Sequence, residues 1–293
     1  MLLQWSFKKI MSGQNILITG ANGQLGLALQ QKYCDAKAVD SKELDITNLD
    51  TLMNLDWSGI DTIINAAAYT NVDGAETNEG RVSAWQVDAT GAANLALVSI
   101  EKDLTLVHIS SEYVFDGSLE NHKEDEPFTP LGVYGQSKAA GDLSVGLTPK
   151  HYILRTSWVI GEGKNFVRTM IDLGKRGISP TVVDDQKGRL TFTTELVRAI
   201  DHLLTSESDY GTYNISNDGD IVSWADITRE IFSLSNLDLQ VTNTSTEEYF
   251  KDKPGIAPRP LNSGMNLSKV ESTGFSPSDW HEDLKEYVNK ELS

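Results

Sequence analysis

Short apolar runs alternate with longer amphipathic stretches from Asn15 onward. The runs are rich in β-branched residues and do not alternate polar with apolar positions, which is typical of strands buried on both faces of a parallel sheet. The predicted strands are Ile16–Ile18, Ala38–Val39, Thr62–Ile64, Leu104–Ile109 and Tyr152–Leu154. Helical periodicity between them predicts helices over Leu25–Tyr33, Thr47–Leu55, Arg81–Ile100 and Tyr134–Leu143. This alternation predicts an α/β fold with a doubly wound parallel sheet.

The rhythm changes after Trp158, which indicates a second, smaller α/β domain. Helices are predicted over Val167–Leu173, Thr194–Leu204, Asp226–Leu234 and Ser278–Glu291, and strands over Thr181–Val183 and Gly211–Ser216. A loop is predicted over Thr242–Pro260, because three of the eight prolines lie in Pro254–Pro260. We therefore expect an N-terminal extension at 1–12, a sheet domain of 13–160 plus about 191–220, and a second domain of about 161–190 plus 221–293.

Composition restricts the partners that the chain can have. Lys and Arg number 25 against 42 Asp and Glu, a formal net charge of −17, so nucleic acids and anionic membranes are not expected as partners. No apolar run approaches the roughly 20 residues of a membrane helix. The single cysteine, Cys34, excludes a disulfide within one chain and fits a cytoplasmic location. The five histidines lack metal-ligand spacing, so no metal site is expected.

A glycine-rich turn follows the first predicted strand and opens the first predicted helix. Its glycines are Gly20, Gly23 and Gly26. The first permits the tight turn, the second lets backbone amides approach a pyrophosphate, and the third lets the helix pack closely on the sheet. Backbone donors need no net positive charge, so this turn predicts a dinucleotide site even in an acidic chain.

Asp40 ends the second predicted strand, twenty residues beyond the turn. A carboxylate at this position can accept hydrogen bonds from the adenosine ribose and repels a 2′-phosphate, which favours NADH. Ser41 and Lys42 follow directly and leave NADPH open as the cofactor.

A tyrosine and a lysine are spaced four residues apart, at Tyr134 and Lys138, and share one face of a predicted helix. An ammonium beside a phenol is expected to lower the pKa of the phenol, which can then protonate a carbonyl oxygen as hydride reaches the carbon. Ser111 follows the strand Leu104–Ile109, at the sheet edge where such folds bind ligands, and can hydrogen-bond the same oxygen.

This order of glycine turn, serine and Tyr-x-x-x-Lys is similar to that of the short-chain dehydrogenases/reductases, which have a Rossmann fold. The Gly-x-x-Gly-x-x-Gly spacing and the large C-terminal part resemble the extended branch. Longer strings resemble the dTDP-4-dehydrorhamnose reductase family, and they are Gly23–Gly26, Leu44–Thr47, Asn65–Glu76, Tyr113–Gly117, Arg155–Val159, Asn165–Val167 and Arg259–Ser263. The resemblance implies NADPH- or NADH-dependent reduction of the C4 ketone of dTDP-4-dehydro-L-rhamnose to dTDP-L-rhamnose, for surface polysaccharide synthesis.

The glycine turn and the resemblance together give a set of expected site residues. Catalytic roles are expected for Ser111, Tyr134 and Lys138. Cofactor contacts are expected from Gly20, Asn22, Gly23, Gln24, Leu25, Gly26, Asp40, Ser41, Lys42, Asp45, Ile46, Ala67, Ala68, Tyr69, Tyr134 and Lys138. Contacts with a dTDP-sugar are expected from Thr70, Val72, Ser111, Glu112, Tyr113, Trp158 and Arg259, the last as a partner of the diphosphate.

Several positions depart from the family pattern, among them Ser111 in place of threonine and Leu190 in place of a loop proline. Glu112 stands where the family has aspartate, and Asp88 stands where it has an asparagine that positions the lysine and a relay water. A carboxylate accepts hydrogen bonds but does not donate them, so the resemblance leaves the relay in doubt. A nucleotide-sugar epimerase or dehydratase, and a non-catalytic subunit resembling the regulatory subunit of methionine adenosyltransferase, remain alternatives. A homodimer is left open.

Overall fold

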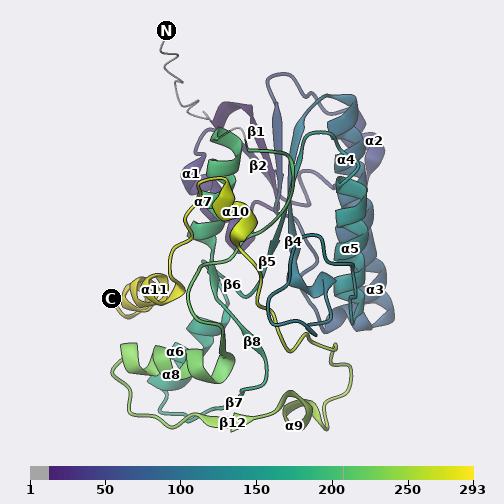
Figure 1. Cartoon of the computed structure of the whole chain (residues 1–293). Coiled ribbons are helices and arrows are strands. Elements are labelled where there is room, and N and C mark those ends of the chain that lie inside the picture. The colour runs from purple at the N-terminus through teal and green to yellow at the C-terminus, as the bar shows by residue number, and fades with distance from the viewer. Residues whose placement is uncertain (1–12, 207) are drawn as a thin grey trace, which may run out of the picture.

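A computed structural model describes residues 13–206 and 208–293, so the predicted extension at 1–12 lies outside the described residues. Its centre is a six-stranded parallel sheet with the strand order β10-β5-β4-β3-β1-β2 (Figure 1). The strands are β1 (Ile16–Thr19), β2 (Lys37–Val39), β3 (Thr62–Asn65), β4 (Thr105–Ser111), β5 (His151–Thr156) and β10 (Gly211–Asn214). The predicted doubly wound parallel sheet is confirmed, with each predicted strand displaced by a few residues at most.

Helices cover both faces of this sheet and give three layers. The core on one face contains side chains of α1 (Gln24–Lys32) and α7 (Thr193–Thr205). The core on the other face contains side chains of α2 (Leu49–Met53), α4 (Ala92–Glu101) and α5 (Val133–Val145). Both faces of the strands are therefore buried, which explains why the strands read as continuous apolar runs.

The predicted helix Arg81–Ile100 is interrupted by a π-helical turn. The chain forms α3 (Asn78–Ala84), then a π-helical turn over Trp85–Gly91, then α4. Such turns insert an extra residue into a helix and are frequent at functional sites. The polar residue that the turn carries into the interior is Asp88, which is 1% exposed.

The second lobe is built around its own apolar core below the sheet in Figure 1. Its helices are α6 (Phe166–Lys175), α8 (Trp224–Leu234), α9 (Thr246–Phe250) and α11 (Trp280–Leu292), and α10 (Ser268–Ser272) returns to the sheet. Its short strands are β6 (Val159–Ile160), β7 (Thr181–Val183), β8 (Lys187–Gly188), β9 (Thr191–Phe192), β11 (Val222–Ser223) and β12 (Thr242–Thr244). Within 13–206 and 208–293, none of these helices or those of the sheet domain has the length and apolarity to cross a membrane.

The loop predicted over Thr242–Pro260 is wrong in its first half. β12 pairs in parallel with β7, and α9 follows it, with Ser245 capping that helix by accepting from the Glu248 amide. The threonines that read as loop residues instead form a short edge strand. The proline-rich part, Pro254–Pro260, lies outside regular structure as predicted.

Three glycines let helices approach neighbouring backbone closely. A Cβ on Gly26 of α1 would lie 2.1 Å from the Gly20 carbonyl oxygen. On α5, a Cβ on Gly135 would lie 2.1 Å from the Tyr113 carbonyl oxygen, and one on Gly141 would lie 2.3 Å from the Asp88 carbonyl oxygen. These helices therefore pack by backbone contact, at distances that side chains would forbid.

Replacing Gly26 by alanine should displace α1 from the glycine turn. We expect a loss of about 3 kcal/mol in the free energy of unfolding, because the new methyl group meets rigid backbone. Urea denaturation followed by circular dichroism measures it. Gly146→Ala is the matched control, since Gly146 has a helical φ of −59° and a Cβ on it would lie 3.2 Å from its nearest neighbour atom, the Asp142 carbonyl oxygen. Equal stability of the two variants would contradict the close approach.

Candidate functional site

A cavity of about 600 Å³ opens at the carboxyl ends of the sheet strands, between the two lobes. Most of the residues that the sequence predicts for the site line it together. They are Asn22, Gly23, Gln24, Leu25, Ala68, Thr70, Val72, Ser111, Glu112, Tyr113, Tyr134, Lys138 and Trp158. The structure thus brings residues from the glycine turn, β4, α5 and the segment after β5 into one space.

The glycine turn has the geometry of an anion site. Gly20 has a φ of +75°, and a Cβ there would lie 2.6 Å from the backbone of Ala66 and Ala67. Gly23 begins α1 without a side-chain cap, while a Cβ on it would meet only the Gly20 carbonyl oxygen, at 3.3 Å. The start of α1 therefore presents its amides and positive dipole end toward the cavity, with room for a phosphate.

Asp40 lies at the end of β2 beside this turn. Its carboxylate accepts from the amides of Lys42 and Glu43, at 2.8 and 3.1 Å, and from the Asn22 side chain, at 2.9 Å. The two backbone hydrogen bonds hold the pKa of the Asp40 carboxyl below its usual range. The side chains of Ser41 and Lys42 are exposed, so neither of them covers the Asp40 carboxylate from solvent.

The segment expected beside the adenine is held in place by hydrogen bonds from α4. Asn94 of α4 donates to the carbonyl oxygens of Ile46 and Thr47, both at 3.0 Å. The Asp45 carboxylate accepts from the Thr47 amide at 2.9 Å, and Ile46 is buried. Asn94 is a residue that the sequence interpretation missed, because its partners lie nearly fifty residues earlier in the chain.

Lys138 is almost completely buried on α5, with its side-chain nitrogen 2.7 Å from the Ile109 carbonyl oxygen. Burial, followed by the carboxylates of Asp88 and Glu112, raises the pKa of the Tyr134 phenol above its usual range. The prediction that Lys138 lowers this pKa is wrong for this arrangement. The ammonium is directed at a backbone carbonyl, so Tyr134 is held as a neutral phenol that can donate a proton.

Asp88 clamps two elements of the site. One carboxylate oxygen accepts from the Tyr69 amide at 3.0 Å and the other from the Ser137 hydroxyl at 3.1 Å. Burial raises the pKa of Asp88, and the nearby Lys138 ammonium opposes that rise. Both oxygens act as acceptors, so the side chain ties the strand end of β3 to α5.

A buried polar chain behind the cavity was not found from the sequence. Asn65 of β3 faces the His108 ring at 3.0 Å, and Asp142 pairs with Arg155 at 3.0 Å. Burial, followed by the Lys138 ammonium, lowers the pKa of His108 well below its usual value, which keeps the ring neutral. The spacing of Tyr134, Lys138 and Asp142 along one helix face was the available signal.

Glu112 is a buried carboxyl group in the wall of the cavity, 2% exposed. The Ser111 hydroxyl donates to it at 2.8 Å. Burial raises the pKa of Glu112 to about 7, although the hydrogen bond from Ser111 opposes the rise. This group can therefore change its protonation state near neutral pH.

The structure places Arg259 outside this cavity. It donates two hydrogen bonds to Asp73, both at 2.9 Å, and its guanidinium lies 4.9 Å from the Phe250 ring centroid. Arg259 instead lines an apolar cavity of about 320 Å³ in the second lobe. Arg168, another cation of the second lobe, pairs with Glu162 and Glu291.

Trp158 forms the wall between these two cavities. It lines the larger cavity and stacks at 3.7 Å on Trp224, which lines the apolar one. Its φ of +46° lies in the left-handed region, which a bulky residue rarely adopts. Strain of this kind is concentrated at ligand sites, so the backbone conformation favours a ligand-facing role.

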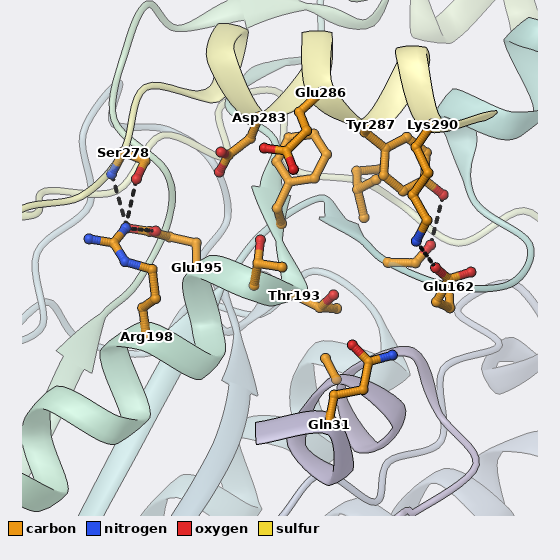
Figure 2. A pocket seen from close by; sticks show the side chains of 15 residues that line it. Gln31, Glu162, Thr193, Glu195, Arg198, Ser278, Asp283, Glu286, Tyr287 and Lys290 are labelled. Carbon is orange, nitrogen blue, oxygen red and sulfur yellow. Dashed lines mark hydrogen bonds and ion pairs between the residues drawn. The ribbon is translucent and has the colours of Figure 1, made fainter. Parts of the chain in front are cut away.

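A third cavity, of about 280 Å³, lies between α1, α7 and α11 (Figure 2). Four of its charged groups form two pairs, Arg198 with Glu195 and Lys290 with Glu162. None of the residues that the sequence predicts for the site lines it. The predicted chemistry is therefore gathered in the larger cavity.

The parallel sheet, the glycine turn and the grouped Ser111, Tyr134 and Lys138 define an extended short-chain dehydrogenase/reductase. Residues 14–293 match the family model described as the RmlD substrate binding domain. The chain is 40% identical to a dTDP-4-dehydrorhamnose reductase of Aggregatibacter actinomycetemcomitans, over 92% of this chain and 97% of that protein. The chain belongs to the RmlD family.

Other relatives differ in their described roles. The chain is 35% identical to the Bacillus subtilis spore coat polysaccharide biosynthesis protein SpsK, over 95% of this chain and 98% of that one. A Bacillus anthracis dTDP-4-dehydrorhamnose reductase solved in complex with NADP superposes with a TM-score of 0.85 at 38% identity, covering 94% of this chain and 97% of that one. Family membership is thus compatible with more than one sugar substrate.

Glu112→Gln should change how stability depends on pH. The folded pKa of about 7 lies above the ordinary value of 4.5, so wild type loses stability as pH rises through this interval, whereas glutamine cannot ionise. Between pH 5 and pH 8 the variant should gain about 2 kcal/mol relative to wild type in urea denaturation. Glu79→Gln, at an exposed position, is the control. A pH-independent difference between wild type and Glu112→Gln would refute the raised pKa.

Proposed function

We propose that this protein reduces the C4 ketone of dTDP-4-dehydro-L-rhamnose to dTDP-L-rhamnose, with NADPH or NADH as the reductant. The observation that carries the proposal is the convergence of Ser111, Tyr134 and Lys138 on one cavity that also contains the glycine turn. The relatives described as dTDP-4-dehydrorhamnose reductases support this substrate over other dTDP-4-keto sugars. The product would serve surface polysaccharide synthesis from the cytoplasm.

The residues present fit a dinucleotide. The uncapped start of α1 at Gly23 would hold the pyrophosphate, and the ionised Asp40 would accept hydrogen bonds from the adenosine ribose. Ile46 would lie against the adenine, on a segment that Asn94 fixes. Ala67, Ala68 and Tyr69, after β3, would border the nicotinamide half. The reduced nicotinamide, when bound, supplies a hydride.

Side chains of the protein would supply the proton that the ketone oxygen takes up. Tyr134, held as a neutral phenol, would donate its proton to the ketone oxygen. The Ser111 hydroxyl would hydrogen-bond the same oxygen and polarise the carbonyl bond. Lys138 would hold the nicotinamide ribose through hydrogen bonds from its ammonium group. Each of these side chains lines the cavity, so a single sugar ring can meet all of them.

The substrate would lie across both lobes. Thr70, Val72, Glu112, Tyr113 and Trp158 would contact the sugar in the larger cavity. The nucleoside would enter the apolar cavity beyond the stacked tryptophans. Arg259 lines that cavity and would meet the diphosphate by exchanging a hydrogen bond to Asp73 for one to phosphate. In this proposal the two lobes are the dinucleotide and the nucleotide-sugar domains.

Tyr134→Phe tests the proposed acid. With enzymatically generated dTDP-4-dehydrorhamnose, oxidation of NADPH or NADH is followed at 340 nm. We expect a loss of at least about 100-fold in kcat, because a general acid contributes 10²- to 10⁴-fold, with cofactor binding unchanged. Tyr210→Phe, at a half-exposed tyrosine outside the cavity, should retain activity. Turnover that survives in Tyr134→Phe would overturn the assignment, and tightly retained NAD without net oxidation would favour an epimerase or dehydratase.

Asp40→Ser tests the cofactor preference. Removing the carboxylate removes repulsion of a 2′-phosphate, so the ratio of kcat/KM for NADPH over NADH should rise about tenfold, equivalent to about 1.4 kcal/mol. Steady-state kinetics with each cofactor measure the ratio. Asp35→Ser removes the same charge at another exposed position and should leave the ratio unchanged. An unchanged ratio in Asp40→Ser would remove Asp40 from the ribose site.

A further inference from the structure

The loop of residues 161–165, between β6 and α6, is fastened to the start of α1. The Gly161 amide donates to the Gln24 side chain at 2.8 Å. A Cβ on Gly161 would lie 3.1 Å from the Cβ of Gln24, so the two backbones are close to each other. Lys164 of this loop lines the larger cavity together with the glycine turn. The second lobe thus brings a lysine to the part of the cavity where the dinucleotide pyrophosphate would bind.

Hydrogen bonds hold both ends of this loop. Asn165 donates to the Gly161 carbonyl oxygen at 2.8 Å and caps α6 by accepting from the Arg168 amide at 3.0 Å. The Tyr287 hydroxyl donates to the same Gly161 carbonyl oxygen at 2.9 Å. The side chain of Lys164 itself is exposed. The backbone therefore places Lys164 at the cavity, while its long side chain keeps the freedom to reach a ligand.

Lys164 differs from the neighbouring cations because it has no acidic partner. Arg168 and Lys290 both pair with Glu162, and the second of these pairs is visible in Figure 2. The other lysine that lines the larger cavity, Lys138, donates to a backbone carbonyl oxygen. Among residues 13–206 and 208–293, Lys164 forms neither an ion pair nor a side-chain hydrogen bond. Its ammonium is therefore available to an anion in the cavity.

The place of Lys164 in the sequence is electrostatically unfavourable unless an anion is bound. It immediately precedes Asn165, the N-cap of α6. The amino end of a helix carries a partial positive charge, which disfavours an ammonium beside it. The uncapped start of α1 at Gly23 adds a second positive helix end to the lining of the same cavity. A ligand with two negative charges would relieve this repulsion.

We propose that Lys164 binds the pyrophosphate of the dinucleotide cofactor through charge-assisted hydrogen bonds. This role rests on the part of the proposed function that places NADPH or NADH at the glycine turn. The start of α1 would supply neutral amide donors, and Lys164 would supply a positive charge to a chain whose formal net charge is −17. A dTDP diphosphate has the same chemistry, and the contact of Gly161 with Gln24 is the observation that favours the dinucleotide.

Direct binding of NADH and of NADPH to the full chain, followed by cofactor fluorescence without any sugar nucleotide, tests this role. Lys164→Gln should raise the Kd of both cofactors about tenfold, because a charged hydrogen bond to phosphate is lost. Added salt should weaken binding more steeply in wild type than in Lys164→Gln. Lys164→Arg keeps the charge and should recover most of the affinity. Lys285→Gln removes the same charge from an exposed lysine of α11 and should leave both Kd values unchanged.

Titration of the same variants with dTDP separates the two sources of a diphosphate. The Kd of dTDP, measured by calorimetry, should be unchanged in Lys164→Gln. A loss confined to NADPH would place Lys164 at the 2′-phosphate, and a loss confined to dTDP would place it at the substrate diphosphate. Either result, or unchanged binding of all three ligands, would overturn the proposal. Weakened binding of both cofactors, in a protein that reduces no dTDP-4-keto sugar, would support this role of Lys164 and overturn the proposed reduction alone.

Discussion

The site depends on how closely α5 can approach the end of β4. Gly135 allows backbone contact there, since a Cβ on it would overlap the Tyr113 carbonyl oxygen, and Gly141 lets the same helix contact the π-helical turn at the Asp88 carbonyl oxygen. This approach buries Lys138 against the Ile109 carbonyl and brings Tyr134 beside Ser111. A larger residue at either glycine would move the helix outward and separate the phenol from the strand end. The chemistry therefore rests on two residues that have no functional group.

Burial then decides the charge state of each group. Tyr134 and His108 are held neutral, while Asp142 retains the Arg155 guanidinium beside it. For Glu112, the hydrogen bonds offset the effect of burial only in part, and its pKa is raised to about 7. Burial away from water sets these charge states with little need for nearby cations. This suits a chain whose formal net charge is −17. In the proposed function, the anionic ligand would be bound by helix amides and by cations that already have local partners.

The sequence predicts the elements whose signals are local. The six-stranded sheet, the glycine turn and the placement of Ser111, Tyr134 and Lys138 at one edge follow from short strings, while the roles of these residues remain predictions. Contacts between distant segments could not be predicted from the sequence. Examples are the contact of Asn65 with His108 and that of Arg259 with Asp73, which are 186 residues apart. The direction of the Lys138 ammonium was missed for the same reason, because its acceptor is a backbone atom of another element.

The π-helical turn that carries Asp88 has a further consequence for how this site can vary. Each residue of an α-helix advances the rotation about the helix axis by about 100°. An extra residue therefore rotates the side chains that follow it by this fixed angle relative to the side chains that precede it. Point substitutions can change which residue stands at position 88, but they cannot rotate that position gradually toward or away from α5. The direction of the side chain at position 88 therefore depends on the number of residues in the turn. Only an insertion or deletion within Trp85–Gly91 would change that direction.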